Sequence, residues 1–431
     1  MRPQRIAPIV LVSALLMTVA AACSGATPTV PTSSEGVSPA TTSTSSIPTI
    51  GATSTGETTT SSSTPAATTT PSPPAPPTTP SASCAATIVK GLTPDERAGQ
   101  LLMVGLDVNA GHSSLDQLVR SRHLGGVILL GGWYDGAVAV RATTSHLAGL
   151  ASKQDTGGLG LFLAADQEGG NVQQLRGAGF TRIGTARAQD RLSPSQLANA
   201  SATWATQMKN AGINVNLAPV ADTVPTSIGR ANQPIGRWDR QFSSDPDRVA
   251  QMVGGFIAGM HRGEVAATIK HFPGLGRITG NTDTTATGIT DRTTTTTDPY
   301  LRPFAAGIKD GADLVMVGSA IYAKIDPGTN AVFSRRVVTD LLRGRLGYTG
   351  VVITDDVGAA KSVAAVPVDE RATRFIAAGG DIVLTAVPAT IAPMHEAITA
   401  RMASDTAFAK QVDASVARVV ALKVSRGLTH C

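Results

Sequence analysis

Eight short apolar segments, separated by stretches with helical periodicity, constrain the fold of this chain more than any other feature of its sequence. Each segment is aliphatic or β-branched, and polar and apolar residues do not alternate within it, which is typical of strands buried on both faces. The segments are Leu101–Leu106, Gly126–Leu130, Gly160–Ala165, Ile213–Ala218, Val265–Lys270, Asp313–Gly318, Val351–Thr354 and Asp381–Leu384. Strictly alternating β and α elements favour a parallel sheet, and eight repeats in about 350 residues predict a closed (β/α)8 barrel of the TIM type.

The stretch Asp247–Arg262 illustrates the helical periodicity between these segments. Its apolar residues recur three or four positions apart, as in a helix that packs one face against a sheet. They are Val249, Met252, Val253, Phe256, Ile257 and Met260. An open, doubly wound α/β sheet is the alternative architecture, and it is disfavoured because no glycine-rich dinucleotide-binding motif follows the first predicted strand.

The first 83 residues differ in kind from the rest of the chain. Residues 1–22 are typical of an export signal, since Arg2 and Arg5 precede the apolar stretch Ile6–Ala22. Residues 24–83 are almost wholly Ser, Thr, Pro, Ala and Gly, a composition that cannot bury enough apolar surface to fold. We therefore expect a signal peptide at 1–22, a disordered Ser/Thr/Pro-rich linker at 23–83, and the barrel at 84–431.

The three cysteines predict how the two ends of the chain are held. Cys84 opens the globular region and Cys431 is the last residue, so these two can form a disulfide in an exported protein. Cys23 follows three alanines, which resembles a bacterial lipobox, although leucine is usual three positions before the cysteine. Lipidation of Cys23 would anchor the protein on the outer face of the cell membrane. Cleavage at an Ala-x-Ala site would instead release a secreted protein.

Charge and cysteine content exclude several classes of protein. The chain has 36 basic and 31 acidic residues and a formal net charge of +5, without a basic run, which argues against a dedicated nucleic-acid binder. Three cysteines are too few for a disulfide-dense scaffold or a multi-cysteine zinc module. The seven histidines form no cluster with metal-ligand spacing, so no metal site is expected.

Polar side chains follow four of the predicted strands. In strand order they are Asp166 and Glu168, then Asp222, then Lys270 and His271, then Asp355 and Asp356. In a barrel, the carboxyl ends of all strands open onto one rim, and the active site is built there. The joint placement of these residues therefore predicts an active site.

Asp355 and Asp356 indicate the chemistry of that site. Because successive side chains of a strand point in opposite directions, only one of the two is expected to face the barrel axis. A carboxylate in that position can attack the anomeric carbon of a sugar and form a covalent glycosyl intermediate. The alternative is that Asp355 only caps the following helix. Lys270 could instead form a Schiff base, as in an aldolase, but that chemistry needs a desolvated lysine, and its neighbours are polar.

Five sequence blocks, in the same order, resemble the β-N-acetylhexosaminidases of glycoside hydrolase family 3, over most of residues 92–425. The blocks are Asp166-Gln-Glu-Gly-Gly-Asn-Val-Gln, Gly212-Ile-Asn-Val-Asn-Leu-Ala-Pro-Val-Ala-Asp222, Asp239-Arg-Gln-Phe-Ser-Ser-Asp-Pro246, Lys270-His-Phe-Pro-Gly274 and Thr354-Asp-Asp356. The resemblance implies a single-domain barrel and a retaining, cofactor-free enzyme that acts on terminal N-acetylglucosamine of cell-wall glycan or muropeptides. It also implies that Asp355 is the nucleophile. The residues that it implies for holding the sugar are Asp166, Arg240, Lys270 and His271.

The chain departs from the family pattern in the loop after Lys270-His-Phe-Pro-Gly274. Members of the family carry the histidine that acts as general acid/base there, and this chain has Thr285 in its place. A threonine hydroxyl cannot exchange protons near neutral pH, which predicts an impaired enzyme. Asp283 could donate the proton instead if burial raises its pKa. Further departures are Gln174, where an arginine is expected, and the inserted pair Arg237-Trp238.

Three functions follow from these observations. The first is a retaining exo-β-N-acetylglucosaminidase that hydrolyses cell-wall glycan through a covalent intermediate on Asp355. The second is a lipoprotein that keeps the sugar pocket and binds glycan without turnover, because Thr285 and Gln174 replace functional residues. The third is an unrelated barrel activity, such as aldol chemistry on Lys270.

Overall fold

The computed structural model describes residues 80–431. The predicted signal peptide, the predicted lipidation site Cys23 and the linker up to residue 79 lie outside the described residues. The boundary predicted at residue 84 falls inside helix α1 (Pro80–Gly91), so the folded region includes residues ahead of it. Within residues 80–431, no helix has the length and apolar character needed to cross a membrane.

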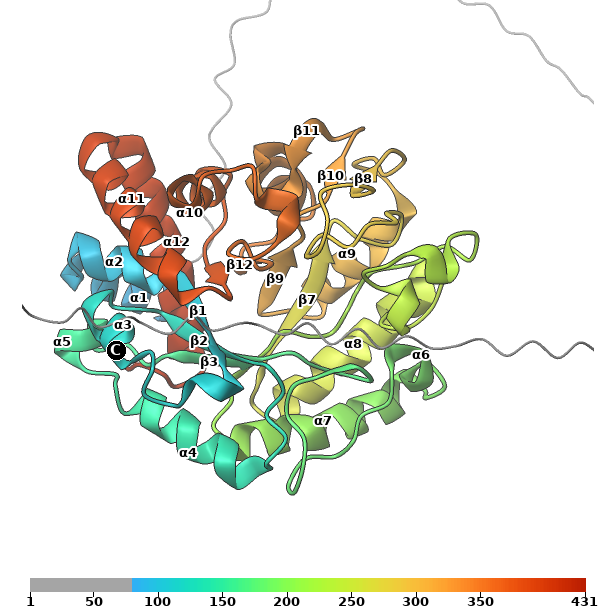
Figure 1. The fold of residues 1–431 in the computed structure, drawn as a ribbon, viewed down its shortest axis with the longest axis horizontal. Coiled ribbons are helices and arrows are strands. Elements are labelled where there is room, and N and C mark those ends of the chain that lie inside the picture. Colours follow the sequence, from blue (N-terminus) through green and yellow to red (C-terminus); the bar gives the residue numbers. More distant parts are fainter. Residues whose placement is uncertain (1–79) are drawn as a thin grey trace, which may run out of the picture. The chain divides into compact units, whose positions relative to one another are not determined.

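Eight parallel strands form the centre of this region (Figure 1). They are β1 (Leu102–Asp107), β2 (Gly126–Leu130), β3 (Phe162–Ala165), β6 (Val215–Asn216), β7 (Ala266–Phe272), β9 (Leu314–Val317), β12 (Val351–Thr354) and β13 (Val383–Thr385). Their hydrogen-bonded order is β12-β9-β7-β6-β3-β2-β1-β13, and a parallel bridge between Ile353 and Ile382 joins the two outer strands. The sheet therefore closes into the predicted α/β barrel of the TIM type.

Each strand falls on one of the eight predicted segments, but β6 is much shorter than the predicted Ile213–Ala218. Two residues explain the difference. At the start, the Asn214 side chain replaces part of the backbone ladder: its Oδ1 accepts the N–H of Leu163 at 2.9 Å and its Nδ2 donates to the carbonyl of Leu161 at 3.0 Å, while the Asn214 N–H still donates to the Leu163 carbonyl. At the end, Pro219 has no N–H to donate to a ladder.

Helices alternate with the strands and surround the barrel (Figure 1). Besides α1 they are α2 (Pro94–Gln100), α3 (Asp116–Ser121), α4 (Ala137–Ala148), α5 (Lys153–Thr156), α6 (Ala186–Gln189), α7 (Pro194–Asn210), α8 (Pro246–Arg262), α9 (Arg302–Lys309), α10 (Val368–Ala377), α11 (Ile391–Ser404) and α12 (Thr406–Ser425). A π-helical segment, Arg336–Arg345, connects β9 to β12. Two small sheets lie in the connections, one of β4 (Gln167–Gly169) and β5 (Val172–Gln173), the other of β8 (Thr290–Asp291), β10 (Ile321–Tyr322) and β11 (Asp326–Asn330).

Local sequence signals set the helix starts. α2 and α7 begin with a capping box followed by proline, in which Thr93 pairs with Glu96 and Ser193 with Gln196. α8 covers the predicted stretch, and its six apolar residues at helical spacing are all buried. Burial of this face against the sheet contributes most of the stability of such a helix.

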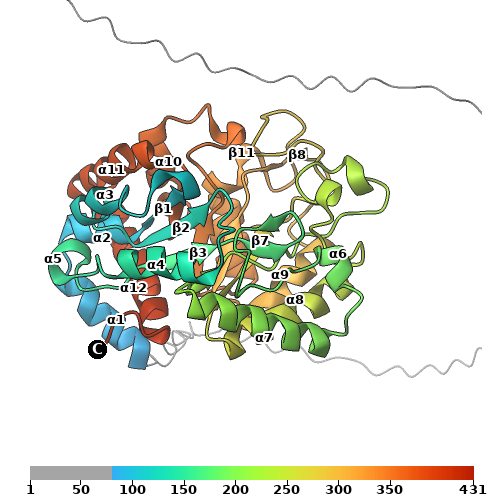
Figure 2. The same ribbon diagram turned by 60° about the horizontal axis from the view of Figure 1, so that its bottom comes forward.

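The two ends of the described region meet. Cys84 and Cys431 form the disulfide expected from the sequence, with their Cα atoms 5.6 Å apart. Helices α1 and α12 pack side by side, and the C-terminus lies next to α1 (Figure 2). The start and the end of the barrel are therefore tied together.

Candidate active site

A cavity of about 300 Å³ opens at the carboxyl ends of the barrel strands, and we call it the rim cavity. All six predicted catalytic and sugar-binding residues line it: Asp166, Arg240, Lys270, His271, Asp283 and Asp355. Apolar side chains complete its wall, namely those of Ile128, Leu130, Val172, Leu217, Met316 and Leu384. The rim cavity thus combines an apolar wall with a few convergent polar groups, as is usual for small-ligand sites.

Asp355 and Asp356 follow β12, and both line the rim cavity. Their carboxylates nevertheless have different surroundings. Asp356 accepts the backbone N–H groups of Gly358 at 2.8 Å, Ala386 at 2.9 Å and Ala359 at 3.1 Å. Asp355 accepts one N–H among the described residues, that of Asp356, at 2.9 Å. Asp356 therefore holds two loops in place, while Asp355 keeps an oxygen available to a ligand.

A buried ion-pair network forms one side of the rim cavity. Lys270 Nζ lies 2.5 Å from Asp166 Oδ1 and 2.7 Å from Glu168 Oε1. Glu168 also binds Arg240 through two nearly parallel hydrogen bonds of 2.8 and 2.9 Å. Burial works to raise the pKa of Glu168, but the charges of Arg240 and Lys270 prevail and lower it to about 2. The network therefore fixes the polar ends of Asp166, Lys270 and Arg240 in a single geometry.

The same network bears on the Schiff-base alternative for Lys270. Burial works to lower the pKa of Lys270, but the charges of Asp166 and Glu168 outweigh it, so the pKa is raised. A lysine that forms a Schiff base needs the opposite shift, because its neutral amine is the nucleophile. Lys270 therefore serves as a hydrogen-bond donor at this site.

His271 lies between the ion-pair network and a fully buried carboxylate. Its Nδ1 lies 2.7 Å from Asp222 Oδ2, and its Nε2 lies 3.5 Å from Arg240 Nη2. Asp222 also accepts the backbone N–H of Leu275 at 2.7 Å. An ionised carboxylate only accepts hydrogen bonds, so Nδ1 of His271 carries the proton that joins the two, and Nε2 faces the cavity. The peptide bond between Lys270 and His271 is cis, and both side chains line the rim cavity.

Asp283 lies in the loop between β7 and β8, at the mouth of the rim cavity. Backbone hydrogen bonds attach this loop to the segment after Asp355, because Lys361 donates to the Asp283 carbonyl at 3.1 Å and Ser362 to that of Thr282 at 3.0 Å. Asp283 as a whole is exposed, but the protein atoms around its carboxyl group and then the charge of Asp355 raise its pKa to about 6, against the opposing charges of His271 and Arg240. A carboxylic acid of this kind can donate a proton near neutral pH.

Two residues that depart from the family pattern take part in local structure. Thr285 Oγ1 shares a hydrogen bond of 2.9 Å with Thr287 Oγ1, and Thr285 is not among the residues that line the rim cavity. Gln174 Oε1 accepts the backbone N–H of Gly132 at 3.0 Å, and its backbone carbonyl accepts that of Trp133 at 2.8 Å. Gln174 therefore connects two rim loops.

Sequence reasoning placed Glu168 and Asp222 at strand ends without assigning them a role. In the structure, Glu168 is the centre of the ion-pair network, and Asp222 orients His271. The signal that could have found Glu168 is its position two residues after Asp166, close to the strand end. Nothing in the sequence alone pairs Asp222 with His271, because the two lie 49 positions apart and only the fold brings them together.

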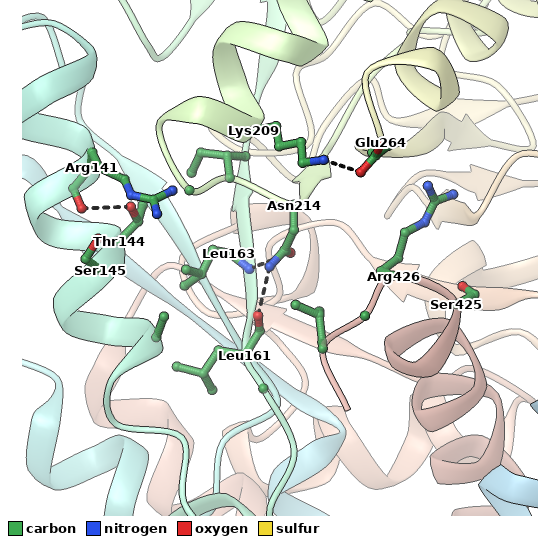
Figure 3. Close-up of a pocket in the computed structure, with 16 residues that line it drawn as sticks. Arg141, Thr144, Ser145, Leu161, Leu163, Lys209, Asn214, Glu264, Ser425 and Arg426 are labelled. Atoms are coloured by element: carbon green, nitrogen blue, oxygen red, sulfur yellow. Dashed lines mark hydrogen bonds and ion pairs between the residues drawn. The ribbon is translucent and has the colours of Figure 1, made fainter. Parts of the chain in front are cut away.

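A second cavity of about 570 Å³ lies at the amino ends of β3 and β6, and we call it the base cavity (Figure 3). Two of the three cations that line it have carboxylate partners. Lys209 forms an ion pair with Glu264, Arg426 forms one with Asp313, and Arg141 points to the carbonyl of residue 210 at 3.4 Å. The base cavity is the larger of the two, but it holds none of the predicted site residues.

Known proteins share the fold and much of the sequence. The model of the glycosyl hydrolase family 3 N-terminal domain matches residues 93–422. A β-hexosaminidase from Xanthomonas euvesicatoria pv. vesicatoria (strain 85-10) is 35% identical over 255 residues, which are 58% of this chain and 74% of the relative. One from Stenotrophomonas maltophilia (strain K279a) is 37% identical over 256 residues, with 57% and 73% covered. The crystal structure of a β-N-acetylhexosaminidase from Beutenbergia cavernae DSM 12333 matches with a TM-score of 0.75 and 45% identity, over 77% of this chain and 98% of that one.

Proposed function

Since this chain belongs to glycosyl hydrolase family 3 and is a glycoside hydrolase of the β-N-acetylhexosaminidase type, we propose that it is a retaining exo-β-N-acetylglucosaminidase acting on cell-wall glycan. The observation that carries this proposal is the pairing of two unlike carboxyl groups in the rim cavity. Asp355 has a free oxygen, while Asp283 has a pKa raised to about 6. Groups with such different environments take different parts in glycoside hydrolysis.

In the first step, an Asp355 oxygen attacks the anomeric carbon of the terminal sugar. The bond from that carbon to the leaving-group oxygen breaks, and this oxygen takes the proton of Asp283. The products are a covalent glycosyl ester on Asp355, an ionised Asp283 and the released alcohol.

In the second step, a water molecule attacks the same carbon, and Asp283 takes a proton from it. The ester bond to Asp355 breaks, which restores the Asp355 carboxylate and the acid form of Asp283. Two inversions give retained stereochemistry, and no cofactor takes part.

The ion-pair network holds the sugar in this scheme. Asp166 accepts hydrogen bonds from sugar hydroxyls, while Lys270, Arg240 and His271 present donors and acceptors to hydroxyl and acetamido oxygens. Glu168 and Asp222 fix these side chains before the sugar arrives. Binding therefore costs little side-chain conformational entropy.

A sugar-binding protein without turnover is the second candidate. It rests on Thr285 in place of the acid/base histidine. The raised pKa of Asp283 favours the enzyme, because it supplies an acid at the cavity that does not depend on residue 285.

We also propose that the enzyme is exported and anchored through a lipid on Cys23, with a glycan or muropeptide outside the cell membrane as substrate. The export signal, the lipobox-like alanines and the long Ser/Thr/Pro-rich linker support this proposal. Metabolic labelling with a fatty acid, compared between the natural chain and Cys23→Ser, tests the anchor; equal labelling of the two would disprove it.

Trapping of the intermediate tests the proposed reaction. A 5-fluoro glycosyl fluoride of N-acetylglucosamine slows the second step, so peptide mass spectrometry should find one sugar attached to Asp355. Asp355→Asn should carry no label and should hydrolyse nitrophenyl N-acetylglucosaminide at a small fraction of the natural rate. Equal turnover by the natural enzyme and Asp355→Asn would refute the proposal.

A further inference from the structure

Trp238 and Tyr134 are the exposed aromatic side chains among the large hydrophobic residues of the described region, with 44% and 52% exposure. Trp238 ends a short 3-10 turn, Gly236–Trp238, which lies between two residues that line the rim cavity, Pro234 and Arg240. Two residues of chain span at most about 7 Å, so the backbone of Trp238 lies close to that of Arg240. The exposed indole therefore belongs to a turn whose backbone adjoins the wall of the rim cavity.

A buried side chain fastens the turn with Trp238 to the loop that leads to Asp283. Asn232 is fully buried, and its Nδ2 donates to the carbonyls of Leu275 at 2.7 Å and Ile278 at 2.8 Å. Its Oδ1 accepts the backbone N–H of Gly236 at 2.7 Å. The turn and the loop are thus held together as one unit.

The backbone after Trp238 is held in an uncommon conformation. Asp239 has a φ of +55°, in the left-handed region that residues other than glycine rarely adopt. Arg230 Nη1 binds Asp239 Oδ2 at 3.2 Å, and Asp239 N–H donates to the carbonyl of Gly236 at 3.3 Å. Such conformations persist only where the surroundings support them, and they gather at ligand sites.

We propose that Trp238 is a platform on which the sugar of the leaving group stacks, an inference that rests on the function proposed above. A cavity of about 300 Å³ is small even for a single-ligand pocket, so it takes one sugar ring and the rest of the glycan lies outside it. The leaving-group oxygen receives the proton of Asp283, so its sugar lies beside the loop to which the Trp238 turn is fastened.

The chemistry of the platform fits a β-linked sugar. The face of an indole ring is electron-rich, and the axial C–H groups on one face of such a sugar are apolar and weakly positive. The guanidinium of Arg237 lies over the Trp238 ring, 5.4 Å from its centroid. The sugar therefore stacks on the opposite face of the indole, and the nearby cation also accommodates an acidic substituent on the leaving sugar.

Tyr134 is the competing candidate, and the topology disfavours it. It follows β2, which β3 and β6 separate from β7 in the sheet, whereas Trp238 follows β6, the neighbour of β7. The loop with Asp283 follows β7, so the leaving sugar lies nearer to Trp238.

The test compares two substrates that differ in the leaving group. The β-1,4-linked disaccharide of N-acetylglucosamine releases a sugar, whereas N-acetylglucosaminyl fluoride releases an ion that cannot stack. Trp238→Ala should lower the ratio of their kcat/KM values (disaccharide over fluoride) about tenfold, which corresponds to about 1.4 kcal/mol. Trp238→Phe should restore most of the ratio, because a phenyl ring still offers a stacking face, and a merely structural role for the indole predicts no such selective change.

The matched control is Tyr134→Ala, the other exposed rim aromatic, which should leave the ratio unchanged. A fall in the ratio with Tyr134→Ala and none with Trp238→Ala would overturn the assignment. Failure of the natural enzyme to turn over either substrate would refute the proposed function instead. The contact itself is then tested in Asp355→Asn by tryptophan fluorescence, since Trp133 and Trp204 are buried. The disaccharide should quench the emission, and equal quenching after Trp238→Ala would overturn the platform.

Discussion

The cavities at the two ends of the barrel differ in how their charged side chains are paired. The base cavity is larger, at about 570 Å³, and its Lys209 and Arg426 each have a carboxylate partner. The rim cavity is about 300 Å³ and brings Asp283, Asp355 and Asp356 together, with the nearby cations committed largely to Glu168 and Asp166. Cavity size therefore does not indicate which end is the active site.

The difference lies in which charges are left without a partner. At the amino end, Lys209 and Arg426 each lie against a carboxylate, Glu264 and Asp313, and these cations lower the pKa of both acids. At the carboxyl end, burial and then the charge of Asp355 raise the pKa of Asp283, and burial raises that of Asp356. Such uncompensated groups are unfavourable for stability, and they are what acid–base catalysis needs.

Asp283→Asn should give the largest effect on kcat/KM, and it tests whether the carboxyl groups of the rim cavity carry the acid–base chemistry. General acid–base catalysis contributes about 10²–10⁴ in rate, so kcat/KM on a disaccharide should fall by about 10³. Because Asp283 must be protonated to donate, kcat/KM of the natural enzyme should decline as the pH rises above about 6, and this decline should disappear in Asp283→Asn. A pH profile of both forms checks the expectation.

Thr284→Val is the control for Asp283→Asn, because Thr284 is the exposed neighbour and does not line the rim cavity. It should keep both the rate and the pH profile. Thr285→His should bring no gain, since Thr285 does not line the rim cavity either. A rate gain of tenfold or more with Thr285→His would mean that the natural loop lacks its acid.

A smaller effect, on stability, is expected from Glu168→Gln. Glu168 compensates the buried charges of both Arg240 and Lys270, and breaking a buried ion pair by removing one partner costs about 3–5 kcal/mol. The free energy of unfolding should therefore fall by several kcal/mol, and KM should rise because the sugar-binding side chains lose their fixed positions. Urea denaturation and steady-state kinetics measure the two effects. An unchanged KM would mean that Glu168 does not position the site.

The network around Glu168 also shows how far sequence reasoning reaches. The eight strands were predictable, because buried parallel strands need continuous apolar segments, and so was the gathering of Asp166, Lys270 and Asp355 at one rim. The shortness of β6 was not predictable, because the Asn214 side chain replaces part of the backbone pairing there. The pKa of Asp283 was not either, since it depends on a neighbour 72 positions away, Asp355, that only the fold brings near.

Lys423 differs from Lys209 and Arg426 at the amino end, because no carboxylate of the described region compensates its charge. Its replacement by methionine should change the free energy of unfolding by about 1–3 kcal/mol. It is fully buried, donates to Gln100 at 2.6 Å, and has no carboxylate partner within residues 80–431, so burial lowers its pKa from 10.5 to about 7. The unfolded chain then binds more protons between pH 7 and 10, so the free energy of unfolding should rise over this range. Lys423→Met should be more stable below pH 7 and should lack this rise. Identical pH curves for the two forms, by chemical denaturation, would contradict the prediction.

The smallest effect is expected in the base cavity, from Lys209→Gln. The Lys209 and Glu264 side chains are exposed, and exposed ion pairs contribute little because water and salt screen them. Both kcat/KM and the Tm should therefore stay close to the natural values, the former within about twofold. Because Lys209 lines the larger cavity, this result would show that the active site is identified by its chemical groups and not by the size of its cavity. A tenfold loss of kcat/KM would mean that the base cavity takes part in binding glycan, and the contrast between the two ends of the barrel would fail.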